Sequence, residues 1–232
     1  MKCLVGANIP VTKLLQGAET DYLLQYDDHS YYWQFMSMSY FFHKHWGLEL
    51  NFQAGTSSKI KHRADNFITD VQAKYDDKYY VHPTTGAEYD DDEFYLFLGD
   101  ISRGYLGLIY RFETKKFYVY PKFAIGVISF STDWGSADLK EKNSNIECKI
   151  NYSSKKIPND HFTIAPSVSF GYKILNRLYL NADIMFSHYK TNIVFKKETT
   201  NLYTNKSSME YFDYKKSIST LSLGTGLIYI IH

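Results

Sequence analysis

The chain has 232 residues, of which 18% are aromatic, from 22 Tyr, 16 Phe and 3 Trp. Lysine and arginine total 26 against 25 aspartate and glutamate, which argues against the basic field of a nucleic-acid-binding domain. No run approaches the roughly 18 consecutive apolar residues of a membrane-spanning helix, and the mean hydropathy is −0.36. A helical membrane protein is therefore excluded, whereas a strand barrel is not, because its apolar residues alternate with polar ones.

The N-terminal segment, residues 1–8, lacks the apolar core and the small-residue cleavage site of a signal peptide. We expect either a cytosolic protein or a mature chain whose leader was removed. Cys3 and Cys148 are too few to predict a disulfide framework or a zinc site. Proline and glycine are sparse and no linker or repeat divides the chain, which predicts a single domain over 1–232.

Apolar residues recur with a period of two in several runs, as expected for strands. In 162–174 the even positions are apolar, aromatic or proline, and the odd positions are mostly small or polar. In chain order, the predicted strands lie within 3–9, 36–42, 48–54, 105–112, 119–127, 162–174, 178–186 and 221–231. Polar segments at 10–31, 57–93, 132–160 and 190–216 separate them in pairs, and the members of each pair are joined by a few residues.

These elements predict an all-β fold: an eight-stranded antiparallel up-and-down transmembrane β-barrel with four long external loops and three short periplasmic turns. An even strand number closes such a sheet with both chain ends on one side. Pro121 and Pro166 fall within strands, where each removes a ladder hydrogen bond, so we expect a bulge or weak pairing there. The segment 100–104 breaks the strand parity and predicts a bulge or the membrane boundary.

The two faces of the predicted strands differ in charge. The apolar face carries no charge, as expected where a charge at mid-bilayer costs roughly 2–4 kcal/mol. We predict that it faces lipid; its representatives are Met36, Met38, Leu48, Leu50, Phe52, Leu106, Leu108, Phe123, Ile125, Val168, Phe170, Leu180, Ile184, Leu223 and Leu227. The small, polar face then encloses a charge-paired lumen network, predicted to comprise Glu49, Arg111, Lys122, Lys173 and Asp183. An eight-stranded barrel is only wide enough for side chains, so a wide pore is disfavoured.

Aromatic residues also collect near the predicted tight turns, as in an interfacial girdle. These residues are Phe42, Trp46, Phe112, Phe117, Tyr172, Tyr179 and Tyr229. A soluble barrel with the apolar face inside, like a lipocalin, is the alternative arrangement.

The strand and loop pattern resembles the small outer-membrane β-barrels of the OmpA/OmpX type. The stretches YFFHKHWGLEL at 40–50 and YLGLIYRF at 105–112 are similar to hairpin halves of outer-membrane β-barrel domains from Bacteroidetes-type bacteria. The resemblance implies a Gram-negative outer-membrane location, insertion through the barrel-assembly machinery and a leader peptide absent from this chain. Family members usually end on an aromatic residue, whereas this chain ends Ile230-Ile231-His232.

Few residues suggest chemistry. Ser187 and His188 lie beside Asp183 in sequence, but adjacent strand residues point to opposite faces, so we predict no catalytic site. His43 and His45 share a face without an evident third ligand, so we predict no metal site and no cofactor. The acidic run 90–93 could hold Ca²⁺, although a solvated loop tip is the simpler interpretation.

The segment 190–216 is rich in lysine, and Lys190, Lys196 and Lys197 would lie just beyond the apolar band. There they could meet lipopolysaccharide phosphates. We therefore predict a monomeric, non-enzymatic outer-membrane protein, structural or adhesive, whose tyrosine-rich loops bind an external protein or glycan. The alternatives are a lipid-modifying outer-membrane enzyme and a soluble small-ligand barrel.

Overall fold

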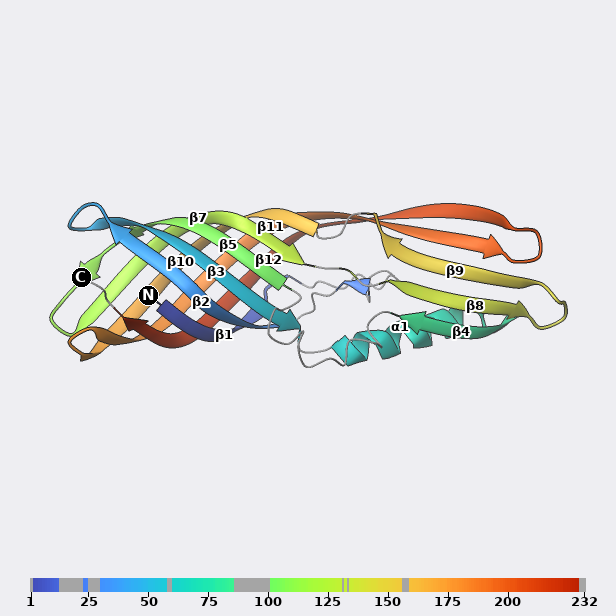
Figure 1. Ribbon diagram of the computed structural model, residues 1–232, viewed down its shortest axis with the longest axis horizontal. Coiled ribbons are helices and arrows are strands. Elements are labelled where there is room, and N and C mark those ends of the chain that lie inside the picture. Colours follow the sequence, from blue (N-terminus) through green and yellow to red (C-terminus); the bar gives the residue numbers. More distant parts are fainter. Residues whose placement is uncertain are drawn as a thin grey trace.

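The computed structural model describes residues 2–12, 23–24, 30–57, 60–85, 101–130, 132, 134–155 and 159–229. Eight antiparallel strands pair in the order β10, β7, β5, β3, β2, β1, β12, β11, and β11 pairs with β10 to close a ring (Figure 1). Their bounds are β1 Lys2–Pro10, β2 Ser30–Phe41, β3 Trp46–Ser57, β5 Ile101–Tyr110, β7 Phe117–Phe130, β10 Asn159–Leu175, β11 Leu178–Asn201 and β12 Lys206–Tyr229.

Short turns close one end of the ring, which we call the turn end. The turn between β2 and β3 is held by the His43 N–H, which donates to the Trp46 carbonyl at 3.2 Å. Between the short strand β6 (Phe112–Glu113) and β7, the Thr114 N–H donates to the Phe117 carbonyl at 2.7 Å. The third turn joins β10 to β11 at residues 176–177. The first described strand, β1, and the last, β12, both belong to the ring (Figure 1).

Two prolines interrupt the pairing of the ring on one side each. Pro121 pairs with Val168 of β10, but on its other side the β5 ladder stops at Ile109 and resumes in β6 at Phe112. Pro166 pairs with Phe123 of β7, while the pairing of β10 with β11 skips residues 165 and 166. Weak pairing at the prolines, one of the two predicted outcomes, is therefore present, because proline has no N–H to donate.

The bulge predicted near 100–104 is not present at residues 101–104, and Asp100 lies outside the described residues. The ladder of β5 with β3 is continuous from Ile101 to Tyr110. The apolar residues change parity here because Ile101 points into an apolar cluster at the ring mouth, the end of the ring opposite the turn end. Arg103, on the same face, points into the polar interior below that cluster. A register shift instead occurs in β2, between Gln34 and Met36.

At the opposite end the long strands β11 and β12 continue beyond the ring as a paired hairpin. They carry a further sheet in the order β11, β9, β8, β4, built from β9 Glu147–Ser154, β8 Gly135–Glu141 and β4 Tyr79–Thr85. Helix α1, Ile60–Tyr75, lies against β4 and β8 (Figure 1). We call α1, β4, β8, β9 and residues 190–217 the extension, since the pairing of β11 with β10 reaches only to Tyr189.

The extension corrects the prediction of long external loops. The described parts of 57–93, 132–160 and 190–216 contain a helix and regular strands, and only residues 202–205 turn between β11 and β12. The apolar alternation in these strands is weaker than in the ring because charged residues such as Lys149 and Lys140 stand on their exposed face. The sequence of these strands therefore resembles that of a polar loop.

One apolar cluster runs from the ring mouth into the extension. It joins Ile128 and Tyr189 of the ring to Phe67 of α1 and Tyr152 of β9, all nearly fully buried. The rings of Phe67 and Tyr152 meet edge to face, with centroids 5.7 Å apart. No helix in the described part of the chain is long and apolar enough to cross a membrane.

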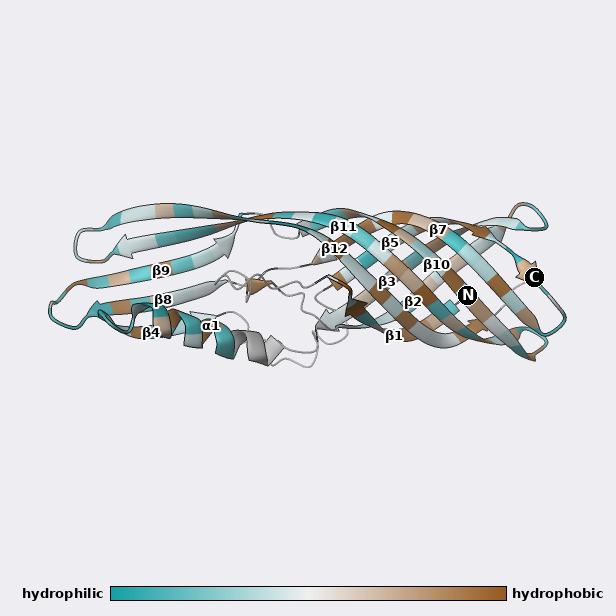
Figure 2. Ribbon diagram, turned by 180° about the vertical axis from the view of Figure 1, so that it is seen from behind, coloured by the Kyte–Doolittle hydropathy of each residue, from teal (hydrophilic) through white to brown (hydrophobic). Residues whose placement is uncertain are grey.

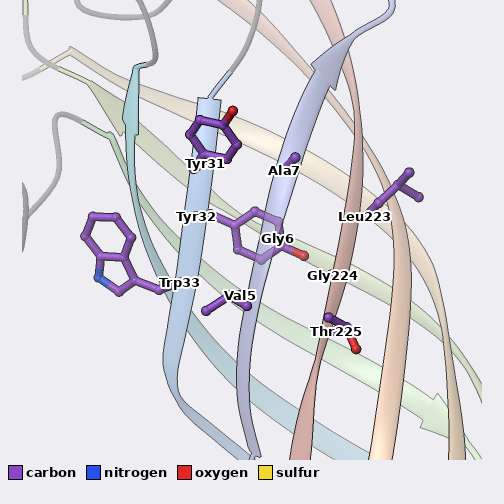
Figure 3. Close-up of a pocket in the computed structure, with 9 residues that line it drawn as sticks. All are labelled: Val5, Gly6, Ala7, Tyr31, Tyr32, Trp33, Leu223, Gly224 and Thr225. Carbon is purple, nitrogen blue, oxygen red and sulfur yellow. The ribbon is translucent and has the colours of Figure 1, made fainter.

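Within the ring, tyrosine side chains lie over glycines of neighbouring strands. Tyr32 extends from β2 across Gly6 toward Gly224, which face each other in the pairing of β1 with β12 (Figure 3). A Cβ added at Gly6 would lie 2.6 Å from the Tyr32 ring, and one at Gly171 would lie 1.8 Å from the Tyr118 ring. Glycine is therefore required at both positions for the rings to approach the backbone.

Candidate functional site

The outer face of the ring is apolar. Figure 2 shows hydrophobic residues concentrated along the ring strands, while the distal extension is mostly hydrophilic or neutral. All fifteen side chains that the sequence assigned to lipid point outward, and each is exposed except Val168, which is half-buried. Exposed fractions reach 62% for Met38 and 56% for Phe123. An apolar surface this continuous is not normal for a monomer in water.

The inner face encloses a compact cluster of four charges. Lys122 Nζ lies 2.9 Å from Glu49 Oε1 and 4.0 Å from Asp183 Oδ2. Lys2 Nζ pairs with the same oxygen, Asp183 Oδ2. The cluster contains two cations and two anions, so the buried charges balance one another, as burial of ions requires.

Neutral side chains complete this cluster. Ser169 and Lys2 both donate to the Asp183 carboxylate, and Asn181 Nδ2 donates to Asp183 Oδ1 at 2.8 Å. Ser39 Oγ donates to Glu49 Oε2 at 3.1 Å. The carboxylates therefore have both ionic and neutral donors, which compensates for the loss of water.

Two predicted members lie elsewhere. Arg111 is at the turn end, where its Nη2 donates to the Lys44 carbonyl at 2.8 Å and its guanidinium stacks 4.3 Å from the Phe41 ring centroid. Lys173 is half-buried near the same end, and its N–H donates to the Lys116 carbonyl at 2.8 Å. Both positions share the strand parity of the lumen face, but they lie too close to the turns to reach the cluster. The sequence therefore predicted on which face of the sheet these two side chains lie, but not their position along the axis of the ring.

Other enclosed residues were missed. Lys2 precedes the predicted first strand, and nothing in its sequence context indicated a partner 181 positions away. A second polar layer links Arg103 Nη1 to Asn8 Oδ1 at 2.9 Å, and Asn8 Nδ2 to Ser30 Oγ at 2.9 Å. Arg103 fell in the segment of uncertain parity, and Ser30 in a predicted loop, so neither was assigned to a face.

The interior around the charges is almost filled. The cavity beside Glu49, Lys122, Tyr105 and Ser167 has a volume of about 20 Å³. A single water needs about 10–15 Å³ by a comparable measure. This part of the interior accommodates about one water and is no open channel.

Aromatic side chains ring the turn end on the outside. Six of the seven residues predicted for a girdle are exposed there: Phe42, Trp46, Phe112, Phe117, Tyr172 and Tyr229. The prediction is wrong for the seventh residue, Tyr179, because its side chain points inward and packs against Tyr118 with ring centroids 5.5 Å apart. Its position on the polar parity of β11 explains this.

A shallow apolar depression of about 630 Å³ lies over β2, β1 and β12 (Figure 3). Val5 and Ala7 of β1 are smaller than the flanking Tyr31, Trp33 and Leu223, so the surface is hollowed along β1. The depression is open and continuous with the apolar exterior.

The residues considered for catalysis do not form a triad. Ser187 is buried inside and His188 points outward, so they lie on opposite faces, and Asp183 faces the interior. Instead, His188 Nδ1 lies 2.9 Å from Ser219 Oγ on the paired strand. His45 Nδ1 contacts the Arg111 carbonyl at 3.1 Å, and its ring lies 6.2 Å from that of His43. Among the described residues, no three His, Cys, Asp or Glu side chains are placed to hold a metal.

The distal lysines are dispersed. Lys190 is exposed on the outer face of β11, Lys196 pairs with Glu198 at 2.7 Å, and Lys197 faces the opposite side, where it donates to Tyr75 Oη at 2.9 Å. The acidic run 90–93 lies outside the described residues, as does the C-terminal segment 230–232.

Comparisons with known proteins give only distant structural likenesses. No family model and no curated protein matches the chain. A major outer membrane protein from Thermus thermophilus is 12% identical with a TM-score of 0.38, covering 99% of this chain and 98% of that one. The KdgM porin is 8% identical with a TM-score of 0.23, covering 100% of both. The translocator domain of autotransporter NalP from Neisseria meningitidis is 7% identical with a TM-score of 0.28, covering 99% and 87%. Scores this low do not establish a common fold.

Proposed function

We propose that the protein is an integral outer-membrane β-barrel whose strand ring spans the bilayer. The observation that carries this proposal is the sidedness of the ring, with exposed aliphatic side chains outside and the paired charges of Lys122, Glu49, Asp183 and Lys2 inside. A spanning strand needs roughly 9–11 residues, and the apolar outward positions of β11 run from Leu178 to Phe186. A soluble lipocalin-like barrel would have the reverse sidedness.

The orientation of the protein in the outer membrane is inferred from the two ends of the ring. Bacterial outer-membrane barrels have short periplasmic turns and longer external segments. By this rule the turn end faces the periplasm and the extension projects outward from the cell. Insertion by the barrel-assembly machinery and contact with lipopolysaccharide then belong to the same proposal, as does a monomeric state.

The eight-stranded ring acts as an anchor, and no open pore is proposed. The balanced charge cluster and the cavity of about 20 Å³ beside it leave no open path at this height. The Tyr32 and Tyr118 rings further fill the interior against Gly6 and Gly171.

We propose that the extension is the binding element. Beyond the apolar belt, which is the outward-facing apolar band of the ring, β11 and β12 continue for roughly 50 Å, from about 15 further residues at about 3.3 Å each. The tip of their hairpin exposes Tyr203 at 84%, Tyr211 at 58% and Met209 at 54%. Rigidly presented tyrosines give contact area at low entropic cost, which suits an external protein or glycan ligand.

Purification and conductance test the anchor. The full chain is expected to stay monodisperse only in detergent and, in planar bilayers, to give no stable conductance of porin size. A monodisperse monomer without detergent would eliminate the membrane function, and a large stable conductance would eliminate the filled interior.

A binding panel tests the extension. The full chain in detergent is applied to immobilised glycans and matrix proteins, with a Tyr203→Ser/Tyr211→Ser variant beside it. We expect retention of the unchanged protein on at least one probe and its loss in the variant. Equal retention of both proteins would place binding elsewhere, and no retention on any probe would contradict an adhesive role.

A further inference from the structure

The outer face of β11 and β12 changes character abruptly where the ring meets the extension. Paired rows along the two strands read Ile184 with Leu223, Phe186 with Leu221, His188 with Ser219 and Lys190 with Ser217. Alternate residues share a face, and Ile184, Phe186 and Leu223 are exposed to at least 39%. Hydrocarbon thus gives way to hydrogen-bonding groups within two residues of each strand, about 7 Å.

The first polar row provides an oriented donor. His188 Nδ1 and Ser219 Oγ are 2.9 Å apart on paired residues of the two strands. If the hydroxyl donates to Nδ1, the neutral ring carries its proton on Nε2; if Nδ1 donates, the hydroxyl proton is available. Either tautomer leaves one donor directed away from the pair.

The second row provides a charge. Three lysines stand on the outer face of these strands, and two have acidic partners: Lys215 pairs with Asp213 at 2.6 Å and Lys196 with Glu198 at 2.7 Å. Lys190 is exposed, and in the described part of the chain no acidic group lies within ion-pair distance of it. Its positive charge stands one row above the His188 and Ser219 pair.

We propose that His188, Ser219 and Lys190 bind the phosphate of a membrane-lipid headgroup; this rests on the proposed membrane function. One oriented donor and a cation at one point of the surface match the oxygen atoms and charge of a phosphate. Apolar side chains beside the site accept the lipid tail, since Val11, whose N–H donates to the Ser219 carbonyl at 2.8 Å, is exposed to 64% and Ile9 to 40%. A soluble anion would gain nothing from this apolar margin.

Lipid retention by the full chain in detergent, read by native mass spectrometry, tests the site. The probes are phosphatidic acid and phosphatidylcholine of identical chains, each titrated separately. We expect tighter retention of phosphatidic acid, and a roughly fivefold weaker retention in Lys190→Gln, the effect of one cation at a lipid surface. His188→Gln and Ser219→Ala should each weaken it as well.

Lys206→Gln is the matched control, because Lys206 is an exposed lysine of the same hairpin at its distal tip. It should leave retention unchanged, and inorganic phosphate should not displace the lipid. Equal retention of the two lipids, equal loss in Lys190→Gln and Lys206→Gln, or displacement by inorganic phosphate would each overturn the site. A chain that does not enter detergent micelles at all would instead overturn the membrane function itself.

Discussion

Among single side chains, the enclosed pair of Lys122 and Glu49 is expected to dominate the stability of the ring. Removing one partner of a buried ion pair costs about 3–5 kcal/mol, because the remaining charge stays buried without compensation. Lys122→Met should therefore lower the free energy of unfolding in lipid vesicles by that amount. The double variant with Glu49→Gln should lose less than the sum of the two single changes.

Lys115→Met provides the comparison, since Lys115 is exposed in the turn before β7. Urea unfolding of the unchanged protein, the two single variants, the double variant and Lys115→Met, followed by tryptophan fluorescence, measures the effect. If Lys122→Met were no more destabilising than Lys115→Met, the ion pair would contribute nothing to the ring.

In the extension, the Glu141 carboxylate is expected to titrate below its usual range. The Ser144 hydroxyl donates to it, and Lys78 Nζ lies 3.2 Å away, so the pKa of Glu141 is lowered. A lowered pKa stabilises the fold above the unfolded pKa, and this contribution disappears as the pH falls through the folded value. Ser144→Ala should raise the pKa of Glu141 in a carboxyl-carbon NMR titration, whereas Ser208→Ala should not. An unchanged pKa in Ser144→Ala would remove the hydroxyl as the cause.

Among the helices and strands, α1 packs into the apolar cluster through Phe67. Phe67 is 1% exposed and packs on Tyr152 and over Gly135, where an added Cβ would lie 2.4 Å from its ring. Phe67→Ala should cost about 3–5 kcal/mol in the extension. Hydrogen exchange should then accelerate in β8 and β9 but not in β3 or β10, since α1 packs mainly against β4 and β8. Asn66→Ala, at an exposed neighbour, should leave both regions unchanged, and uniform acceleration throughout would indicate that ring and extension unfold together.

The elements also differ in how well their sequence predicts them. Ring strands such as β10 alternate strictly because lipid-like apolar positions and lumen positions impose opposite demands on successive residues. In β8 and α1 that contrast is lost, since their exposed faces carry lysine and aspartate like any solvated surface. Arg111 and Lys173 illustrate a second limit: parity gives the face of a residue, but its height depends on strand register, which is set by pairing across the ring.

For the protein as a whole, the central question is where the bilayer ends along β11. Ile184 and Val194 stand on the same outward face of this one strand, the first within the apolar belt and the second in the extension. Arginine near the bilayer midplane costs roughly 2–4 kcal/mol, and the cost falls toward zero at the interface. The proposed membrane position therefore predicts a large penalty for Ile184→Arg and little for Val194→Arg.

Both variants are compared with the unchanged chain by urea unfolding from phosphatidylcholine vesicles. Because the substitution, the strand and the face are the same, differences in strand propensity and expression largely cancel, and the depth of the residue remains as the main variable. Equal penalties at the two positions would mean that the belt does not face hydrocarbon. A penalty confined to Ile184 would place the outer surface of the bilayer between the two residues. That span contains His188 and Lys190, which replace the aliphatic side chains of the outer face.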